Sequence, residues 1–155
     1  MKHLTLEIES DLRQVCLVAA AIHALCAHAG MDHDEASQVE LCLVEAVTNS
    51  IQHAYQEEPG HKVTVTITFE MSQLRFELLD SGISMPLEQV ARLLRGDSIV
   101  EPDTSDLSSL QEDGRGLDII YRTMDEIAYK RNDSQNRLTL TRYLREPYKP
   151  YPSQH

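Results

Sequence analysis

Apolar and polar residues alternate along several short stretches of the chain, which is the pattern of strands that bury one face. In the first stretch, Leu4, Leu6 and Ile8 are separated by polar side chains. The second and third strands, like the last two, are joined by short polar turns and are expected to form hairpins. The predicted strands are residues 4–9, 63–69, 74–78, 127–130 and 138–144.

A spacing of three and four between apolar residues predicts helices elsewhere. Asp32 and Glu35 form a capping-box pair at the start of the second helix, and Gly30 closes the first. Runs of hairpin strands with the helices held elsewhere predict an α+β fold, with helices on one face of a mostly antiparallel mixed sheet. The predicted helices are residues 12–29, 34–55, 86–94 and one that starts at glycines 114–116.

The chain is expected to form a single domain over residues 1–145. Within it, residues 95–113 have few large apolar side chains and no periodicity, which is typical of a functional lid or a disordered loop, and we expect a lid over the ATP site. The proline- and tyrosine-rich residues 146–155 are expected to be an extended or disordered tail.

The formal charge of −11 argues against a nucleic acid or an anionic membrane as partner, because both attract concentrated positive charge. The N-terminal residues do not have the pattern of a signal peptide, and no apolar run is long enough to span a bilayer, so a cytoplasmic protein is expected. Cys16, Cys26 and Cys42 have no CxxC spacing, and we expect them to be reduced, buried small hydrophobic residues.

The most informative stretch is residues 40–55, ELCLVEAVTNSIQHAY. On a helix, Glu45, Asn49 and His53 fall in one polar stripe, opposite an apolar side that can pack on the sheet. A carboxylate, a carboxamide and an imidazole in register predict a face turned toward a ligand. The Asn49 carbonyl could bind Mg²⁺ and Glu45 could act as a base, whereas His53 is more typical of a packing residue at the helix end.

Two glycine-containing segments downstream fit the same ligand. Asp80 ends an apolar strand, so its half-buried carboxylate needs hydrogen-bond donors such as the amino group of adenine. Gly82 would permit a positive φ and the close approach of a flat base. Gly114 and Gly116, placed before a helix, could fold around phosphates, with Arg115 supplying a cation.

These motifs together resemble those of the GHKL ATP-binding superfamily. LVEAVTNSIQHAY is similar to its N box, LLDSGI to its first glycine box and EDGRGLDII to its second. The short chain and the segments HAY and GRGLDII resemble most closely the anti-sigma-factor serine/threonine kinases of the RsbW type. The resemblance covers about residues 4–144. It implies a Bergerat-type two-layer α/β sandwich that binds ATP with Mg²⁺.

The resemblance also implies roles for individual residues. Glu45 would be the catalytic base, Asn49 the Mg²⁺ ligand, and Asp80 the adenine-binding residue with Gly82 as its companion. The second glycine box would supply the remaining nucleotide contacts, from Gly114, Arg115, Gly116 and Leu117.

The sequence departs from the family pattern at two places. The first glycine box often reads DxGxG, but Ser84 occupies the position of its second glycine. A threonine of the closing hairpin often lies near the base, and here Asn136, Thr139 and Thr141 are all candidates.

The resemblance implies a kinase that phosphorylates a serine or threonine of a small antagonist protein of the STAS type. Such a kinase also binds a sigma factor or another regulator, often as a homodimer. The alternative is a non-catalytic nucleotide-binding module that sequesters the regulator. A plain ATPase is a third reading, disfavoured because the chain shows no transducer domain to which hydrolysis could be coupled.

Overall fold

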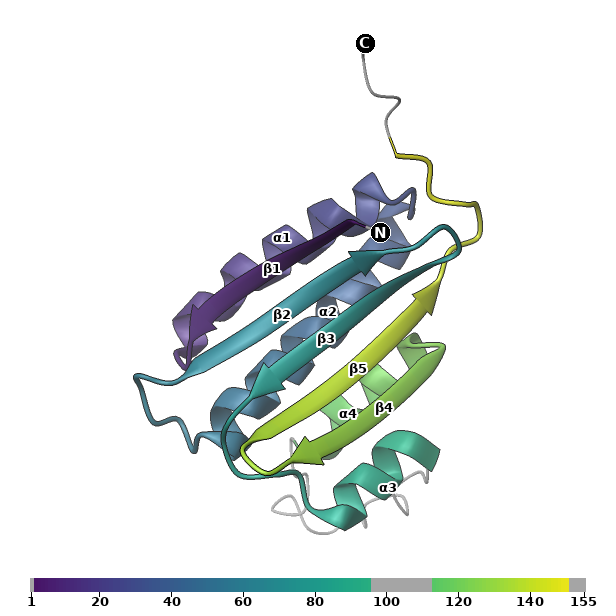
Figure 1. Ribbon diagram of the computed structural model, residues 1–155. Coiled ribbons are helices and arrows are strands. Elements are labelled where there is room, and N and C mark those ends of the chain that lie inside the picture. Colours follow the sequence, from purple (N-terminus) through teal and green to yellow (C-terminus); the bar gives the residue numbers. More distant parts are fainter. Residues whose placement is uncertain (1, 96–112, 151–155) are drawn as a thin grey trace, which may run out of the picture.

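The computed structural model describes residues 2–95 and 113–150, which form a two-layer α+β sandwich around one five-stranded sheet (Figure 1). The strand order is β1-β2-β3-β5-β4. The predicted fold class is confirmed, although the sheet is not mixed: all four strand pairs are antiparallel. The strands are β1 (Lys2–Glu9), β2 (Lys62–Phe69), β3 (Gln73–Asp80), β4 (Glu126–Asn132) and β5 (Gln135–Tyr143).

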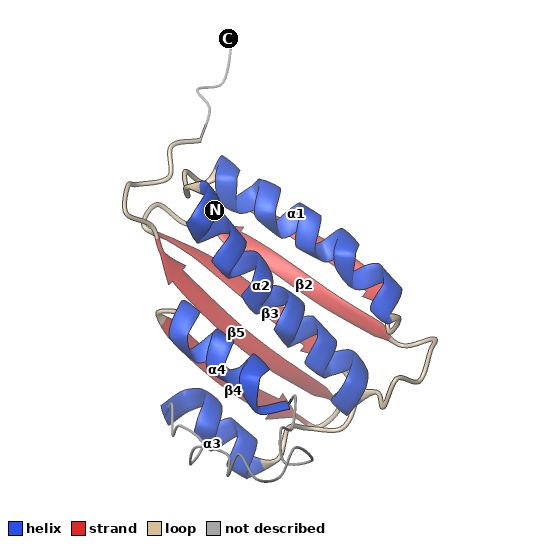
Figure 2. Ribbon diagram, turned by 180° about the vertical axis from the view of Figure 1, so that it is seen from behind, coloured by secondary structure: helices blue, strands red, loops and turns tan. Residues whose placement is uncertain are grey.

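The helices lie on one face of this sheet, with α1, α2 and α4 side by side across it (Figure 2). Helix α3 packs against α4 and β4 at the edge of the layer. The helices are α1 (Val15–His28) after a 3-10 turn η1 (Leu12–Gln14), α2 (His33–Asn49) continued by a π-helix η2 (Ser50–Ala54), α3 (Leu87–Arg95) and α4 (Asp113–Thr123). The predicted lid therefore lies, for residues 96–112, outside the described residues.

The strands bury alternate residues, as the alternation of apolar and polar residues in the sequence predicted. Val63, Val65 and Ile67 of β2 are fully buried against the helices, while the threonines between them are only partly covered. Leu43 and Val47 of α2 supply the opposite side of this core. Burying a side chain of this size contributes roughly 1.5–3 kcal/mol, so the packing of α2 on the sheet holds the polar stripe of α2 in a fixed position.

The predicted start of α2 is confirmed in detail. The Asp32 side chain accepts a hydrogen bond from the backbone N–H of Glu35 at 2.9 Å, and the Glu35 carboxylate accepts one from the N–H of Asp32 at 3.3 Å. This capping box satisfies donors that the first turn of a helix leaves unpaired. Asp11 caps the turn before α1 in a similar way, through the N–H of Arg13.

The end of the same helix differs from the prediction of a regular helix over residues 34–55. The α-helix ends at Asn49, and the chain widens into the π-helix η2, in which the N–H of Tyr55 donates to the carbonyl of Ser50 at 3.0 Å. Gln56 and Glu57 follow with positive φ angles of 51° and 59°. Single π-turns of this kind are frequent at functional sites, and Ser50, His53 and Ala54 of this one line the cavity described below.

The cysteine prediction is correct for two residues and wrong for the third. All three thiols are free, and Cys26 and Cys42 are fully buried, but Cys16 lies exposed on α1. Burial, with the nearby Glu40 carboxylate as a smaller cause, raises the pKa of Cys26 to about 12. Burial also raises the pKa of Cys42, and the charge of Glu45 adds to this effect.

The tail runs along the end of the β2–β3 hairpin as far as the structure describes it. The N–H of Tyr148 donates to the carbonyl of Met71 at 2.8 Å, and the Tyr148 ring packs on Phe69 and His28. Among the described helices, none combines the length and the apolar character needed to cross a membrane.

A candidate nucleotide site

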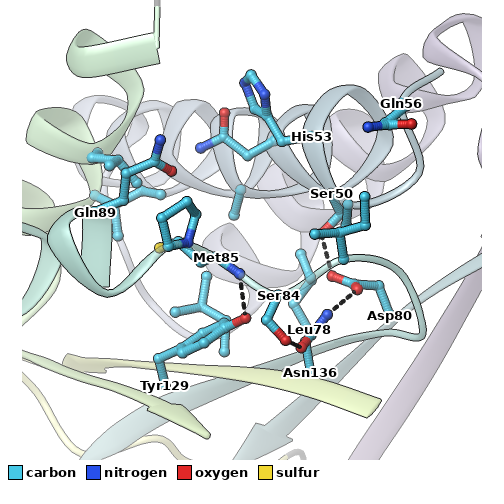
Figure 3. A pocket seen from close by; sticks show the side chains of 18 residues that line it. Ser50, His53, Gln56, Leu78, Asp80, Ser84, Met85, Gln89, Tyr129 and Asn136 are labelled. Carbon is cyan, nitrogen blue, oxygen red and sulfur yellow. Dashed lines mark hydrogen bonds between the residues drawn. The ribbon is translucent and has the colours of Figure 1, made fainter. Parts of the chain in front are cut away.

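A cavity of about 250 Å³ opens between the end of α2, the middle of α4 and the neighbouring ends of β3 and β5 (Figure 3). Its walls are largely apolar, and its polar side chains gather where β3 and β5 meet the last turns of α2 and η2. Ser50, Asp80, Ser84 and Asn136 form what is called here the floor of the cavity.

Asp80 is the centre of the floor. It ends β3, as predicted, but is more deeply buried than the expected half, with 7% of its surface exposed. Its Oδ2 accepts a hydrogen bond from the Ser50 hydroxyl at 2.9 Å, and its Oδ1 accepts from Asn136 Nδ2 at 2.7 Å and from the N–H of Gly82 at 3.1 Å. Three protein donors therefore stabilise a carboxylate that would otherwise be costly to bury.

The structure distinguishes the three closing-hairpin candidates. Asn136 is directly opposite Asp80 in the β3–β5 register and lines the cavity. Thr139 and Thr141 are opposite Glu77 and Arg75, farther along the strand, and neither is a lining residue.

Ser50 was not identified from the sequence. A helical wheel places it toward the apolar side of α2, next to Ile51, and this position was the available signal, because a buried hydroxyl requires a partner. Tyr129 of β4 was also missed. Its hydroxyl accepts the N–H of Met85 at 2.9 Å and so fixes the loop after β3 against the cavity.

Gly82 is required for a different reason from the one predicted. Its φ is not positive, since the glycines with positive φ among the described residues are Gly30 and Gly60. A Cβ atom added at Gly82 would lie 2.2 Å from the carbonyl oxygen of Ala54. That carbonyl accepts the N–H of Ile83 at 2.8 Å, so the glycine lets the β3 loop close the end of η2.

The second glycine box is helical rather than a loop. Gly114, Arg115 and Gly116 lie in the first turn of α4, where Arg115 is exposed, and Leu117 lines the cavity. A Cβ atom added at Gly116 would lie 2.6 Å from Glu45 Oε2. The absence of a side chain therefore lets α4 approach the Glu45 carboxylate of α2. Glu45 and Gly116 are called here the α2–α4 junction.

The polar stripe of α2 is thus divided between two surroundings. Asn49 and Ala46 line the cavity, while Glu45, one turn earlier, is half-buried at the α2–α4 junction. Cys42, on the same helix, is buried in the core, as expected. His53 is exposed and lines the cavity from η2, which differs from the packing role expected for it.

These residues fit a purine nucleotide with a hard divalent cation. Apolar walls suit a flat heterocycle, and a buried carboxylate suits an amino group that donates hydrogen bonds. The amide oxygen of Asn49 is a ligand type that Mg²⁺ accepts together with phosphate oxygens. The described lining residues include no Lys or Arg, so the cation and the exposed Arg115 would have to balance the phosphate charge.

Comparison with known proteins agrees with this geometry. The family described as the histidine kinase-like ATPase domain matches residues 8–142, which include the four α-helices, strands β2, β3 and β4, nearly all of β5 and the end of β1. The chain belongs to this family. The GHKL resemblance of its three motifs is thereby confirmed, and the family is one of ATP-binding domains.

Within this family, the chain is similar in sequence to proteins named as serine-protein kinases. The chain is 26% identical over 141 residues to the serine-protein kinase RsbW of Bacillus cereus, an alignment that covers 90% of this chain and 83% of the relative. It is similar to the same extent to RsbW of Bacillus thuringiensis.

Solved structures show the same fold. The SiaB–SiaC complex of Pseudomonas aeruginosa matches with a TM-score of 0.63 at 17% identity, over 89% of this chain and 88% of that one. A Mycobacterium tuberculosis structure of RsbU and RsbW domains matches with a TM-score of 0.61 at 15% identity. In that case the alignment covers 97% of this chain but 34% of the other, so the chain spans about a third of its length.

Proposed function

We propose that this protein is a Mg-ATP-dependent protein kinase that transfers the γ-phosphoryl group to a serine or threonine of a small partner protein. The observation that carries the proposal is the floor, in which Asp80 is buried at the bottom of an apolar cavity on donors from Ser50, Gly82 and Asn136. A buried acceptor in a cavity of this size suits the amino edge of adenine. The RsbW relatives support the reaction class.

Each residue of the site then has a defined task. Asp80 would accept the amino group of the base, and Leu117 would contact the apolar part of the nucleotide from α4. Asn49 would hold Mg²⁺ through its amide oxygen. Gly114, Arg115 and Gly116 would lie beside the phosphates, because the first turn of a helix can donate its N–H groups to an anion and carries a partial positive charge.

Glu45 would act as the general base. It precedes Asn49 by one helical turn, so the base and the cation ligand project from neighbouring positions on α2. Bound Mg-ATP supplies the electrophilic phosphoryl group. The Glu45 carboxylate would accept the proton of the attacking hydroxyl, the hydroxyl oxygen would form the new bond to the γ-phosphorus, and the bond to ADP would break.

The acceptor is proposed to be an antagonist protein of the STAS type, as the RsbW likeness suggests. A sigma factor or another regulator would be the alternative partner, so that phosphorylation of the antagonist decides which of the two is bound. A homodimer and a lid over residues 95–113 complete the proposal. The likeness to RsbW supports these points through the family, and not through a contact of the described residues.

The test is phosphotransfer by Glu45→Gln. With a STAS-type protein identified by copurification as acceptor, the variant should lose roughly 10²–10⁴-fold in rate, since a general base contributes about that much. Its ATP dissociation constant should change less than about threefold, because the amide has the same shape. Glu40→Gln is the matched control, since Glu40 lies on the same helix but binds His23 at 2.8 Å.

Unchanged phosphotransfer in Glu45→Gln would contradict the role of Glu45. ATP binding with no transfer by the wild-type protein, even with the antagonist present, would instead favour the sequestering module. Transfer to water alone would identify an ATPase.

A further inference from the structure

The two positions at which this chain departs from the family pattern are in direct contact. Ser84 stands where the first glycine box often has its second glycine, and Asn136 is the closing-hairpin candidate that lies opposite Asp80 and lines the cavity. The Ser84 hydroxyl donates to Asn136 Oδ1 at 2.7 Å, across 52 residues of sequence. Figure 3 shows this bond beside the one from Asn136 to Asp80.

Every polar hydrogen of the Asn136 side chain is already used within the protein. Asn136 is 4% exposed, and its Nδ2 donates to Asp80 Oδ1 at 2.7 Å and to the carbonyl of Gly82 at 3.1 Å. The reversed amide would place Oδ1 against a carboxylate and a carbonyl, which are both acceptors. The orientation of the amide is therefore set by its surroundings, and Oδ1 must receive its donor from the other side. Ser84 supplies that donor.

The hydroxyl hydrogens of the other floor residues are also used in hydrogen bonds within the protein. The hydroxyl hydrogen of Ser50 is donated to Asp80, and that of Ser84 to Asn136. Asp80 is an acceptor only. The side chains of the floor thus hold no uncommitted donor, whereas Asp80 Oδ2 and Ser84 Oγ keep lone pairs, and both residues line the cavity.

We propose that Ser84, paired with Asn136, makes the floor accept hydrogen bonds only and so selects a 6-aminopurine over a 6-oxopurine nucleotide. This inference rests on the proposed function, because it concerns the base held at Asp80. An amino group meets acceptors at the floor, whereas a 6-oxo oxygen meets acceptors there and finds no donor among the floor's side chains. Sites whose buried polar groups are left unpaired by the wrong ligand discriminate strongly.

Removing the Ser84 hydroxyl should weaken this selection in a specific way. In Ser84→Ala, Asn136 Oδ1 must take a hydrogen from cavity water, because the amide cannot reverse. That water brings a second hydrogen, which a 6-oxo oxygen can accept, and ATP must displace or accommodate it. Ser84 is accordingly a positioning residue, and its effect is on the choice of ligand.

The experiment is titration calorimetry of the full chain with ATP and with inosine triphosphate, which carries an oxo group in place of the amino group. For the wild type we expect ATP to bind about 100-fold more tightly, a difference within the range that unpaired polar groups produce. For Ser84→Ala the ratio should fall to about tenfold, mostly through weaker ATP binding. Ser84→Thr, which keeps the hydroxyl, should restore the wild-type ratio.

Ser81→Ala is the matched control, because Ser81 is an exposed serine in the same loop that does not line this cavity. Ser84→Gly, the residue of the family pattern, provides a second variant if the alanine protein does not fold. A wild-type protein that binds ATP while Ser84→Ala and Ser84→Gly keep its ATP-to-inosine-triphosphate ratio would overturn the inference and leave the proposed function intact. A wild-type protein that binds neither nucleotide would overturn the proposed function itself.

Discussion

The floor and the α2–α4 junction belong to the same proposed nucleotide site, but their carboxylates are held in different ways. At the floor, Asp80 is almost fully buried and receives three hydrogen bonds from three segments of the chain. At the junction, Glu45 is half-buried. Its carboxylate occupies the space that a side chain at residue 116 would need, so its position depends on Gly116.

In the proposed function, the floor recognises the base and the junction supplies the general base. A buried network with all its donors committed is rigid, and it can discriminate between bases before any conformational change. The half-buried Glu45 carboxylate lies against Gly116, and in the proposed function it would accept the proton of the acceptor hydroxyl. We therefore expect substitutions at the floor to change stability and nucleotide affinity, and substitutions at the junction to change rate.

Gly82→Ala should have the largest effect, and it acts on the floor side. The new Cβ would lie 2.2 Å from the Ala54 carbonyl oxygen, so backbone must move and the bond from the Ile83 N–H is lost. Overpacking and a lost hydrogen bond together should lower the free energy of unfolding by about 2–4 kcal/mol. Urea denaturation measures this. Stability equal to wild type would show that the floor is less rigid than described.

Gly116→Ala tests the junction. There the added methyl group meets the carboxylate of Glu45, the end of a flexible side chain, and not the backbone. The Glu45 carboxylate must move away from the new methyl group, and misplacing a catalytic group by about 1 Å can reduce the rate roughly 10²-fold. Replacing a helical glycine by alanine should raise stability by up to about 1 kcal/mol. Phosphotransfer and thermal unfolding should thus change in opposite directions. A less stable variant with normal transfer would contradict the account.

The two buried thiols, Cys26 and Cys42, can be used to measure how far water is excluded from the helix layer that carries Glu45. Burial raises the pKa of Cys26 to about 12 and also raises that of Cys42. The folded state therefore holds these protons more tightly than the unfolded state, whose cysteines titrate near 8.5. The resulting stabilisation is complete below that pH and is lost as pH rises toward about 12, by up to about 1.4 kcal/mol per pH unit for each thiol.

The measurement is the pH dependence of urea unfolding between pH 8 and 10, roughly the lower part of that range. Cys26→Ala should show a shallower loss of stability than the wild type. In the native protein, a water-soluble thiol reagent should modify Cys16 alone, with the other two reacting only after unfolding. Rapid modification of Cys42 in the folded state would show that the layer under Glu45 is open to water.

Much of the fold could be predicted because it depends on local pattern. The capping box at Asp32 and the alternation in β2 and β3 each require only neighbouring residues, and the structure has them as expected. The π-helix and the requirement for Gly82 depend instead on contact between η2 and a loop about thirty residues away, which no periodicity encodes.

The residues of the candidate site likewise fall into those that sequence motifs predict and those that only tertiary structure brings together. Asn49, Asp80 and Leu117 were found through motifs, and the structure brings them into one cavity. Ser50 and the choice of Asn136 over the neighbouring threonines depend on the register of β5 against β3 and on which hydroxyl reaches a carboxylate. Such pairings are set by tertiary structure, and sequence alone offers a buried polar residue without its partner.

The most direct test of the central claim is calorimetric titration of Mg-ATP into the wild type and into Asp80→Asn. The account predicts saturable binding by the wild type. It predicts an affinity lower by about 10–150-fold in the variant, because a hydrogen bond to a charged group contributes about 1.5–3 kcal/mol. Circular dichroism would show that the variant is folded. No binding to the wild type at millimolar ATP, or equal affinity in the two proteins, would contradict the placement of a nucleotide at Asp80.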